Sequence, residues 1–475
     1  MKRENAASIL AGVAALCLVA WQVAAASRHG ALFVDLRAFY CGGWTVLHHG
    51  NPYDAAPLLT CEQTPQPFGL YTVAVPLLAP FPGYALAVFS LLALMPYTAA
   101  AALWLVLLVG SGLGAALLLA TLCRTGIAGA IAVVTVAFAV AVIPYGQLTP
   151  IVLLALCGAA LALRRNIVSA LVVALAVVAL EPNVALPVFV AVFLWRRDAR
   201  IPLVILCAAL LILHVVVVGP AGALAYFTQV LPAHDASEVR FVNQFSLTWM
   251  AQALGAPLRL SLVLGNVAYV LVCALGVWLA GALACRLRDP ALLVLFPAAC
   301  AVIGGSYVHY SEILLALPAA LLLFAHSSHR GRIYAAFAVA LIAIPWISIP
   351  SQPAVVLAAV GGVAAMCCLT LNLSVSAMLR AALGAALLCA LILLAAFYYG
   401  PALSATHTLG LLDAGAADAA RAAQIAESGA SAGIVWWLVK LPTWLGLLAL
   451  VLSGLNVYTE TRSSLPGNDA VLSRG

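Results

Sequence analysis

Runs of apolar residues, separated by short polar breaks, repeat along this chain from residue 7 to residue 453. The run "AALWLVLLVGSGLGAALLLATL" would be apolar on every face of a helix. It is also long enough to cross a hydrocarbon core, which takes about 20 helical residues. A transmembrane β-strand would instead show alternating segments of about ten residues. The pattern therefore predicts an all-α polytopic membrane protein.

The apolar runs predict 12 to 14 transmembrane helices. We expect spans near 7–26, 98–121, 126–143, 149–163, 167–181, 183–195, 201–219, 258–285, 291–308, 311–325, 333–350, 354–378, 381–399 and 433–453. Tilted or broken helices among the short segments would reduce the number of crossings. We expect one membrane domain over 1–455, followed by a polar cytoplasmic tail over 456–475.

Composition and charge add a class and an orientation. Hydrophobic residues make up 66% of the 475 residues, charged residues make up 8%, and the mean hydropathy is +1.15, which excludes a soluble globular domain. The net charge of +6 does not indicate a nucleic-acid partner, because the basic residues gather in tight turns between spans. By the positive-inside rule, those turns and both termini are cytoplasmic. The protein is then expected in the inner membrane. We expect its first apolar run to be an uncleaved anchor, and a cleaved signal peptide is the alternative.

The longer polar segments, 27–97, 220–257 and 400–432, then all fall on the extracytoplasmic face. Four prolines between residues 76 and 96 interrupt helix hydrogen bonding, so we expect short juxtamembrane helices in the first loop. Cys41 and Cys61 lie in this loop, 20 residues apart, and an oxidising compartment permits a disulfide between them. Two free thiols are the alternative. Any chemistry is expected on this face.

Asp35, in "VDLRAFY", follows the first span by a few residues. A carboxylate at a membrane surface can act as a general base toward an acceptor hydroxyl, because partial desolvation raises its basicity. A helix cap or a topology determinant is the other interpretation. Arg37, two residues on, can pair with Asp35, hold a phosphate, or extend its charge to the membrane interface.

His309, in "YVHYSE", lies at an outer helix end beside Tyr307, Tyr310 and Glu312. An ionisable group at such a position suggests a functional site. A hydrogen-bonded histidine in an interfacial aromatic belt would have the same sequence pattern. Both interpretations remain open from the residues alone.

Several other polar residues fall at expected helix ends on the same face. Glu181 ends one helix, and Pro182 breaks the chain before the next. Gln147, Asn243 and Gln244 are uncharged groups whose amides suit sugar hydroxyls, or which cap loops. Glu181 can equally be a turn residue.

Taken in order, these segments resemble the family 87 glycosyltransferases of the GT-C superfamily, which use polyprenyl-phosphate sugars and include mannosyltransferases. That family's first outer loop has an aspartate followed by aromatic residues and a G-x-P-Y motif, seen here as "VDLRAFY" and "HGNPYD". Its "GQ" turn, later "NQS" segment and late histidine correspond to "YGQLTP", "NQFSL" and "YVHYSE". The resemblance covers about residues 8 to 325. Two departures are "FPGY", which lacks the double proline, and Glu181-Pro182, which stands where the family usually has Lys-Pro.

The resemblance implies a GT-C-like bundle and an inverting transfer of mannose or a related hexose or pentose. The sugar would move from a polyprenyl-phosphate donor to a lipid-linked or cell-envelope acceptor at the outer face. Asp35 would be the catalytic base. The substrate-binding candidates are Arg37, Tyr40, Tyr53, Gln147, Glu181, Arg240, Asn243, Gln244 and His309. No metal ion and no cofactor besides the lipid-linked donor are expected.

A transporter or flippase for a lipid-linked glycan is the alternative function. It would need ionisable groups or broken helices near the middle of the membrane. The polar residues of this chain concentrate instead at outer helix ends, with Lys440 in "WWLVKLP" as the main exception. The pattern therefore favours the enzyme.

Overall fold

The computed structural model describes residues 2–28, 32–63, 76–123, 142–239, 243–305, 307–327, 329–349, 352–357, 387–395 and 433–463, with a few shorter stretches between them. Most of the expected spans 126–143 and 354–378 falls outside these residues, as do parts of the expected span 381–399, the loop 400–432 and Arg240. The described part is helical and contains no named strand, and its one isolated β-bridge joins Gln244 and His309. The prediction of an all-α membrane protein is confirmed.

Among the described residues, five helical segments are long and apolar enough to cross a membrane. They are Tyr97–Cys123, Arg197–Glu238, Leu258–Leu287, Arg330–Ser348 and Ile434–Thr461. Shorter apolar helices include α7 (Thr149–Arg164), α8 (Val168–Val178), α9 (Pro182–Trp195) and α14 (Leu292–Gly304). The segment expected to span 311–325 is made of α15 (Tyr310–Ile313), a 3-10 turn and α16 (Leu317–His326).

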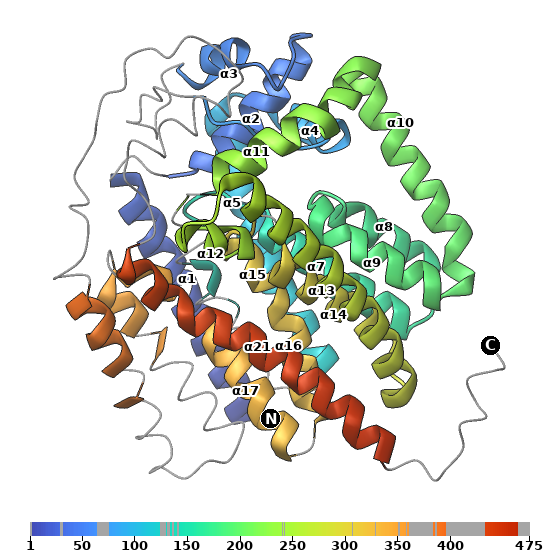
Figure 1. The fold of residues 1–475 in the computed structure, drawn as a ribbon. Helices are drawn as coiled ribbons and strands as arrows, with labels where there is room; N and C mark the ends of the chain where they lie inside the picture. Colours follow the sequence, from blue (N-terminus) through green and yellow to red (C-terminus); the bar gives the residue numbers. More distant parts are fainter. Residues whose placement is uncertain are drawn as a thin grey trace.

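Helix boundaries agree with the hydropathy pattern to within a few residues in the long helices. Helix α5 covers Tyr97–Cys123, and α13 covers Leu258–Leu287. Helix α1 (Lys2–Arg28) runs up from beside α17 (His329–Ala343) in Figure 1. Helix α21 (Ile434–Ser463) continues past the expected domain end at 455.

The first polar segment folds into helices that cover the upper end of the bundle (Figure 1). They are α2 (Val34–Leu47), α3 (Ala55–Glu62) and α4 (Gly83–Ala93). Helix α2 is largely buried, since it packs closely on α4: a Cβ at Gly43 would come within 2.4 Å of the Phe89 carbonyl carbon. Cys41 and Cys61 form a disulfide that joins α2 to α3. The segment is therefore a packed helical layer and not an open loop.

The proline-rich stretch "PLLAPFP" at 76–82 is held by side chains because prolines lack the N–H groups of a regular element. The Tyr53 hydroxyl donates to the Phe81 carbonyl at 2.9 Å, and the Tyr226 hydroxyl donates to the Pro80 carbonyl at 3.1 Å. The Glu62 carboxylate accepts the Leu77 N–H at 3.0 Å. These contacts fix one wall of the site described below.

The segment expected as a loop over 220–257 is mostly helical. Helix α10 (Arg200–Ala225) kinks where Gly219 adopts φ 74° before Pro220. A π-helical turn leads into α11 (Leu231–Glu238), and α12 (Leu247–Ala253) follows after a bend. Because its polar residues suggested a loop, the helical form of this segment was not predicted. Figure 1 shows α11 passing above the bundle beside α2 and α4.

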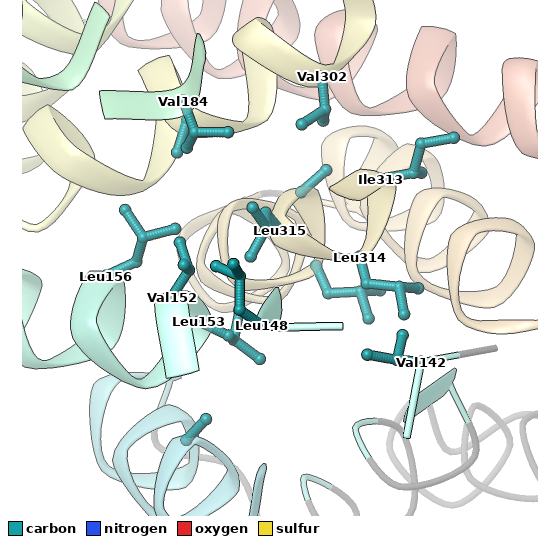
Figure 2. Packing of buried hydrophobic residues seen from close by; sticks show 14 of the residues in the cluster. Val142, Leu148, Val152, Leu153, Leu156, Val184, Val302, Ile313, Leu314 and Leu315 are labelled. Carbon is teal, nitrogen blue, oxygen red and sulfur yellow. The ribbon is translucent and has the colours of Figure 1, made fainter. Parts of the chain in front are cut away.

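A buried aliphatic core lies where α7, α9, α14 and α15 meet (Figure 2). Its members include Val142, Leu148, Val152, Leu153, Leu156, Val184, Val302, Ile313, Leu314 and Leu315. Several of them neighbour polar residues in sequence, as Leu148 follows Gln147 and Ile313 follows Glu312. Close packing of these aliphatic side chains therefore fixes the backbone that carries the polar ones.

Replacing Cys61 by serine is expected to lower the unfolding free energy by about 3 kcal/mol, since the disulfide closes a loop of 20 residues. The measurement is the melting temperature of the purified protein in detergent. Cys207→Ser, at an exposed free cysteine, is the control and should melt like the wild type. Equal melting of both variants would show that the disulfide contributes no stability.

Candidate functional site

A cavity of about 350 Å³ opens beneath the upper helical layer. Its walls come from α2, the stretch 77–81, the start of α9, α11, α13 and the segment 305–312. The polar lining residues are Asp35, Gln147, Glu181, Asn183, Tyr226, His234, Asp235, Glu238, Asn266, Tyr269, Tyr307, His309 and Glu312. Four candidates from the sequence, Asp35, Gln147, Glu181 and His309, thus come together at one site.

Asp35 and Gln147 are brought together by a backbone contact between α2 and the turn before α7. The Phe33 N–H donates to the Pro144 carbonyl at 2.7 Å, and the Asp35 N–H donates to the Tyr145 carbonyl at 2.9 Å. Gly146 has φ +80°, and a Cβ there would lie 2.9 Å from the Leu36 Cβ, so the turn requires glycine. Gln147 Nε2 then donates to Asp35 Oδ2 at 2.8 Å, which orients the carboxylate.

His309 belongs to a second hydrogen-bond network of the site, which it forms with Glu238 and Gln244. His309 Nε2 lies 3.1 Å from Glu238 Oε2, and Gln244 Nε2 donates to the same oxygen at 3.3 Å. Gln244 Oε1 accepts the Val308 N–H at 2.7 Å, and the bridge between Gln244 and His309 fixes the two segments. Gln244 is fully buried, so it positions His309 and Glu238 without lining the cavity itself.

A third group consists of Glu181, Asn183 and Glu312. Pro182 begins α9 and so places Glu181 at the helix end, where its side chain lines the cavity and is 8% exposed. Burial raises the pKa of Glu181 to about 8. The Glu312 carboxylate lies close enough to Glu181 and Asn183 to interact with both, and its Oε2 atom is buried without a hydrogen-bond partner.

The cavity is acidic. Five carboxylates line it, Asp35, Glu181, Asp235, Glu238 and Glu312, together with two histidines, His234 and His309. The described lining residues include no lysine or arginine. Within the described chain, no group of three or more His, Cys, Asp or Glu residues is arranged to hold a metal ion.

Three candidates from the first polar segment lie away from the cavity lining. Arg37 is buried beside Tyr97. The Tyr40 hydroxyl donates to the Met95 carbonyl at 2.8 Å, and Tyr53 supports Phe81 as described above. These side chains hold the helical layer together. Asn243 is described but does not line the cavity either.

Three ionisable residues of α11 were not singled out from the sequence as site residues. They are His234, Asp235 and Glu238, and all three line the cavity. Their spacing in "LPAHDASE" places the first and third four residues apart, on one face of a helix. That periodicity could have indicated a helix with a polar face directed at a site.

Comparison with known proteins gives one finding. The model of glycosyltransferase family 87 matches residues 80–318, just over half of the chain. This range contains Gln147, Glu181, Glu238 and His309, while Asp35 precedes it. Neither the curated proteins nor the solved structures include a match.

The raised pKa of Glu181 predicts a pH dependence of stability. In the folded protein the buried carboxyl keeps its proton up to about pH 8. In the unfolded chain the same carboxyl loses its proton near its ordinary pKa of 4.5. The free energy of unfolding is therefore greatest below pH 4.5. It decreases as the pH rises to about 8, by up to about 1.4 kcal/mol per pH unit from this group. Glu181→Gln should remove this loss, so its melting temperature should exceed that of the wild type increasingly with pH.

The control for this experiment is Asp54→Asn, since Asp54 is exposed at the start of α3. Its melting curve between pH 5 and pH 9 should run parallel to that of the wild type. A constant difference between Glu181→Gln and the wild type over the same range would contradict the assignment of a buried, protonated Glu181.

Proposed function

Because the chain belongs to glycosyltransferase family 87 and is therefore a membrane glycosyltransferase, we propose that it transfers a sugar from a polyprenyl-phosphate donor. The acceptor is a lipid-linked or cell-envelope hydroxyl, and the sugar is mannose or a related hexose or pentose. The observation that carries this proposal is the oriented carboxylate of Asp35, which faces a cavity with Gln147 bound to one of its oxygens.

Asp35 has the position and hydrogen bonding that a general base requires. Gln147 donates to Oδ2 and orients the carboxylate, which would accept the proton of the acceptor hydroxyl. As that proton moves to Asp35, the acceptor oxygen forms a bond to the anomeric carbon, and the bond from that carbon to the phosphate oxygen breaks. Attack from the face opposite the phosphate inverts the anomeric configuration.

The departing phosphate needs hydrogen-bond donors as its charge develops. His309, fixed by Glu238, and His234 on α11 are the imidazoles that line the cavity. Asn266, Tyr269 and Tyr307 add amide and hydroxyl groups. A lipid-linked phosphate monoester bound beside these donors would share the cavity with Asp35.

Exposed apolar helix faces beside the cavity suit a polyprenyl chain. Leu186 lines the cavity and is 57% exposed, and it continues along α9 into the exposed residues Val190 and Phe193. In a membrane this surface contacts acyl chains, so the donor's lipid can remain in the bilayer while its sugar enters the cavity. No cofactor other than this lipid donor is part of the proposal.

The charge pattern supports an outward-facing site in an inner membrane. The basic turns "RRN" at 164–166 and "RRDAR" at 196–200 lie at the ends of α7 and α9 away from Gln147 and Glu181. By the positive-inside rule these turns are cytoplasmic, which puts the cavity on the extracytoplasmic side. The acceptor is then a lipid or glycan of the cell envelope.

Asp35→Asn is expected to reduce transfer by about 10² to 10⁴-fold, because the amide keeps the size of the side chain but cannot take a proton. The assay measures transfer from radiolabelled polyprenyl-phosphate mannose or arabinose to membrane lipid extracts, with purified protein. Asp54→Asn is the control, since this carboxylate is exposed in the same segment. Equal transfer by wild type and Asp35→Asn would refute the proposed base.

Gln147→Met is expected to lower kcat about tenfold with little change in KM, because it removes the bond that orients Asp35 while conserving volume. The measurement is steady-state transfer at varied donor concentration. Gln22→Met is a matched control, since buried Gln22 also forms one amide hydrogen bond, to Gln352 at 3.1 Å. A raised KM with unchanged kcat would assign Gln147 to substrate binding instead.

A further inference from the structure

We propose that Glu181 and Glu312 bind a protonated amino group of the substrate, so that the enzyme acts on an amine-bearing sugar or acceptor. The inference rests on the proposed function in one respect: the cavity must be the place where the reacting sugar and acceptor are held. The inference adds the chemical class of substrate that the cavity selects.

The first argument is the charge of the lining. A donor that brings a phosphate into this cavity meets repulsion from those acidic side chains that are ionised, and the described lining has no lysine or arginine to offset it. Two of the carboxylates have protein partners suited to them, since Asp35 binds Gln147, and Glu238 binds His309 and Gln244. Glu181 and Glu312 form a separate acidic pair at the start of α9 and α15.

The second argument is the pair of acceptor atoms left without donors. Glu312 lines the cavity and is 6% exposed, and its Oε2 atom is buried without a hydrogen-bond partner. The Oδ1 atom of Asn183, two residues after Glu181, is also buried without a partner. Unsatisfied buried acceptors are costly, so a ligand that donates to them is favoured.

An ammonium group fits these acceptors better than a hydroxyl does. It carries three hydrogen-bond donors and no acceptor, and the site offers carboxylate and amide oxygens. When both are ionised, the carboxylates of Glu181 and Glu312 repel each other, and burial favours the protonated form of Glu181. A bound cation allows both to be ionised, which gives charge-assisted hydrogen bonds that a neutral sugar cannot form.

The test is equilibrium binding, measured by calorimetry with the full-length protein in nanodiscs. The probes are short-chain polyprenyl phosphates that carry a 2-amino-2-deoxyhexose, its N-acetyl counterpart, or the plain hexose. A second arm compares phosphatidylethanolamine with its N-acetylated form, which places the amine on the acceptor. The expected result is at least tenfold tighter binding of the free amine than of its N-acetyl form in one arm.

Substitutions then connect the preference to the acidic pair. Glu181→Gln and, independently, Glu312→Gln should reduce the preference to less than threefold, and Glu181→Lys should abolish it by placing an ammonium beside Glu312. Asp54→Asn should keep the full preference, because Asp54 lies outside the cavity. Melting temperatures identify any variant that fails to fold, and the other glutamine variant then decides.

The outcomes separate the two proposals. Equal binding of amine and N-acetyl probes in both arms, or a preference that survives Glu181→Gln and Glu312→Gln, overturns the inference. Binding of Mg²⁺ that depends on Glu181, without an amine preference, overturns it in favour of a metal cation. An amine preference without transfer from any donor would support the inference and count against the proposed function.

Discussion

The geometry of the site depends on the contact between the first turn of α2 and the turn that precedes α7. Two backbone hydrogen bonds from Phe33 and Asp35 to residues 144 and 145 join segments more than 100 residues apart. Gly146 allows the close approach, and the Trp104 indole donates to its carbonyl at 2.7 Å. This contact brings Asp35 together with its amide partner Gln147, although the two belong to different segments.

A second constraint concerns two carboxylates of the lining, which reach the cavity at breaks in helical structure. Pro182 makes such a break before α9, and the residues around Gly305 make another before α15. Each break places a carboxylate, Glu181 or Glu312, at a helix start. The residues that follow belong to the aliphatic core shown in Figure 2. The same packing that buries these carboxylates raises the cost of their charge. Polar chemistry and tight packing are therefore joined at the same residues.

The sequence predicts the helices well because apolar periodicity and proline breaks are local signals, as the bounds of α5 and α13 show. It predicts the site only in part. On α2, Asp35, Ala38 and Phe39 share the face that lines the cavity, at spacings of three and four residues. Arg37 and Tyr40, at spacings of two and five, fall on other faces although they belong to the same motif. The polarity of α11 predicted a loop, although His234 and Glu238 follow a helical period. The distance of this helix from Asp35 in the sequence gives no hint that they share a cavity.

The acidic lining has opposite effects on the two halves of the proposed transfer. Negative charge in the lining favours the transfer of a proton into the site, which a base acting on the acceptor hydroxyl requires. The same charges oppose the build-up of negative charge on the departing phosphate. A cation that arrives with the substrate and binds between Glu181 and Glu312 would reduce the second effect when the cavity is occupied. The electrostatics of the site would then be completed by the substrate, which makes charge on the substrate a determinant of turnover and not of binding alone.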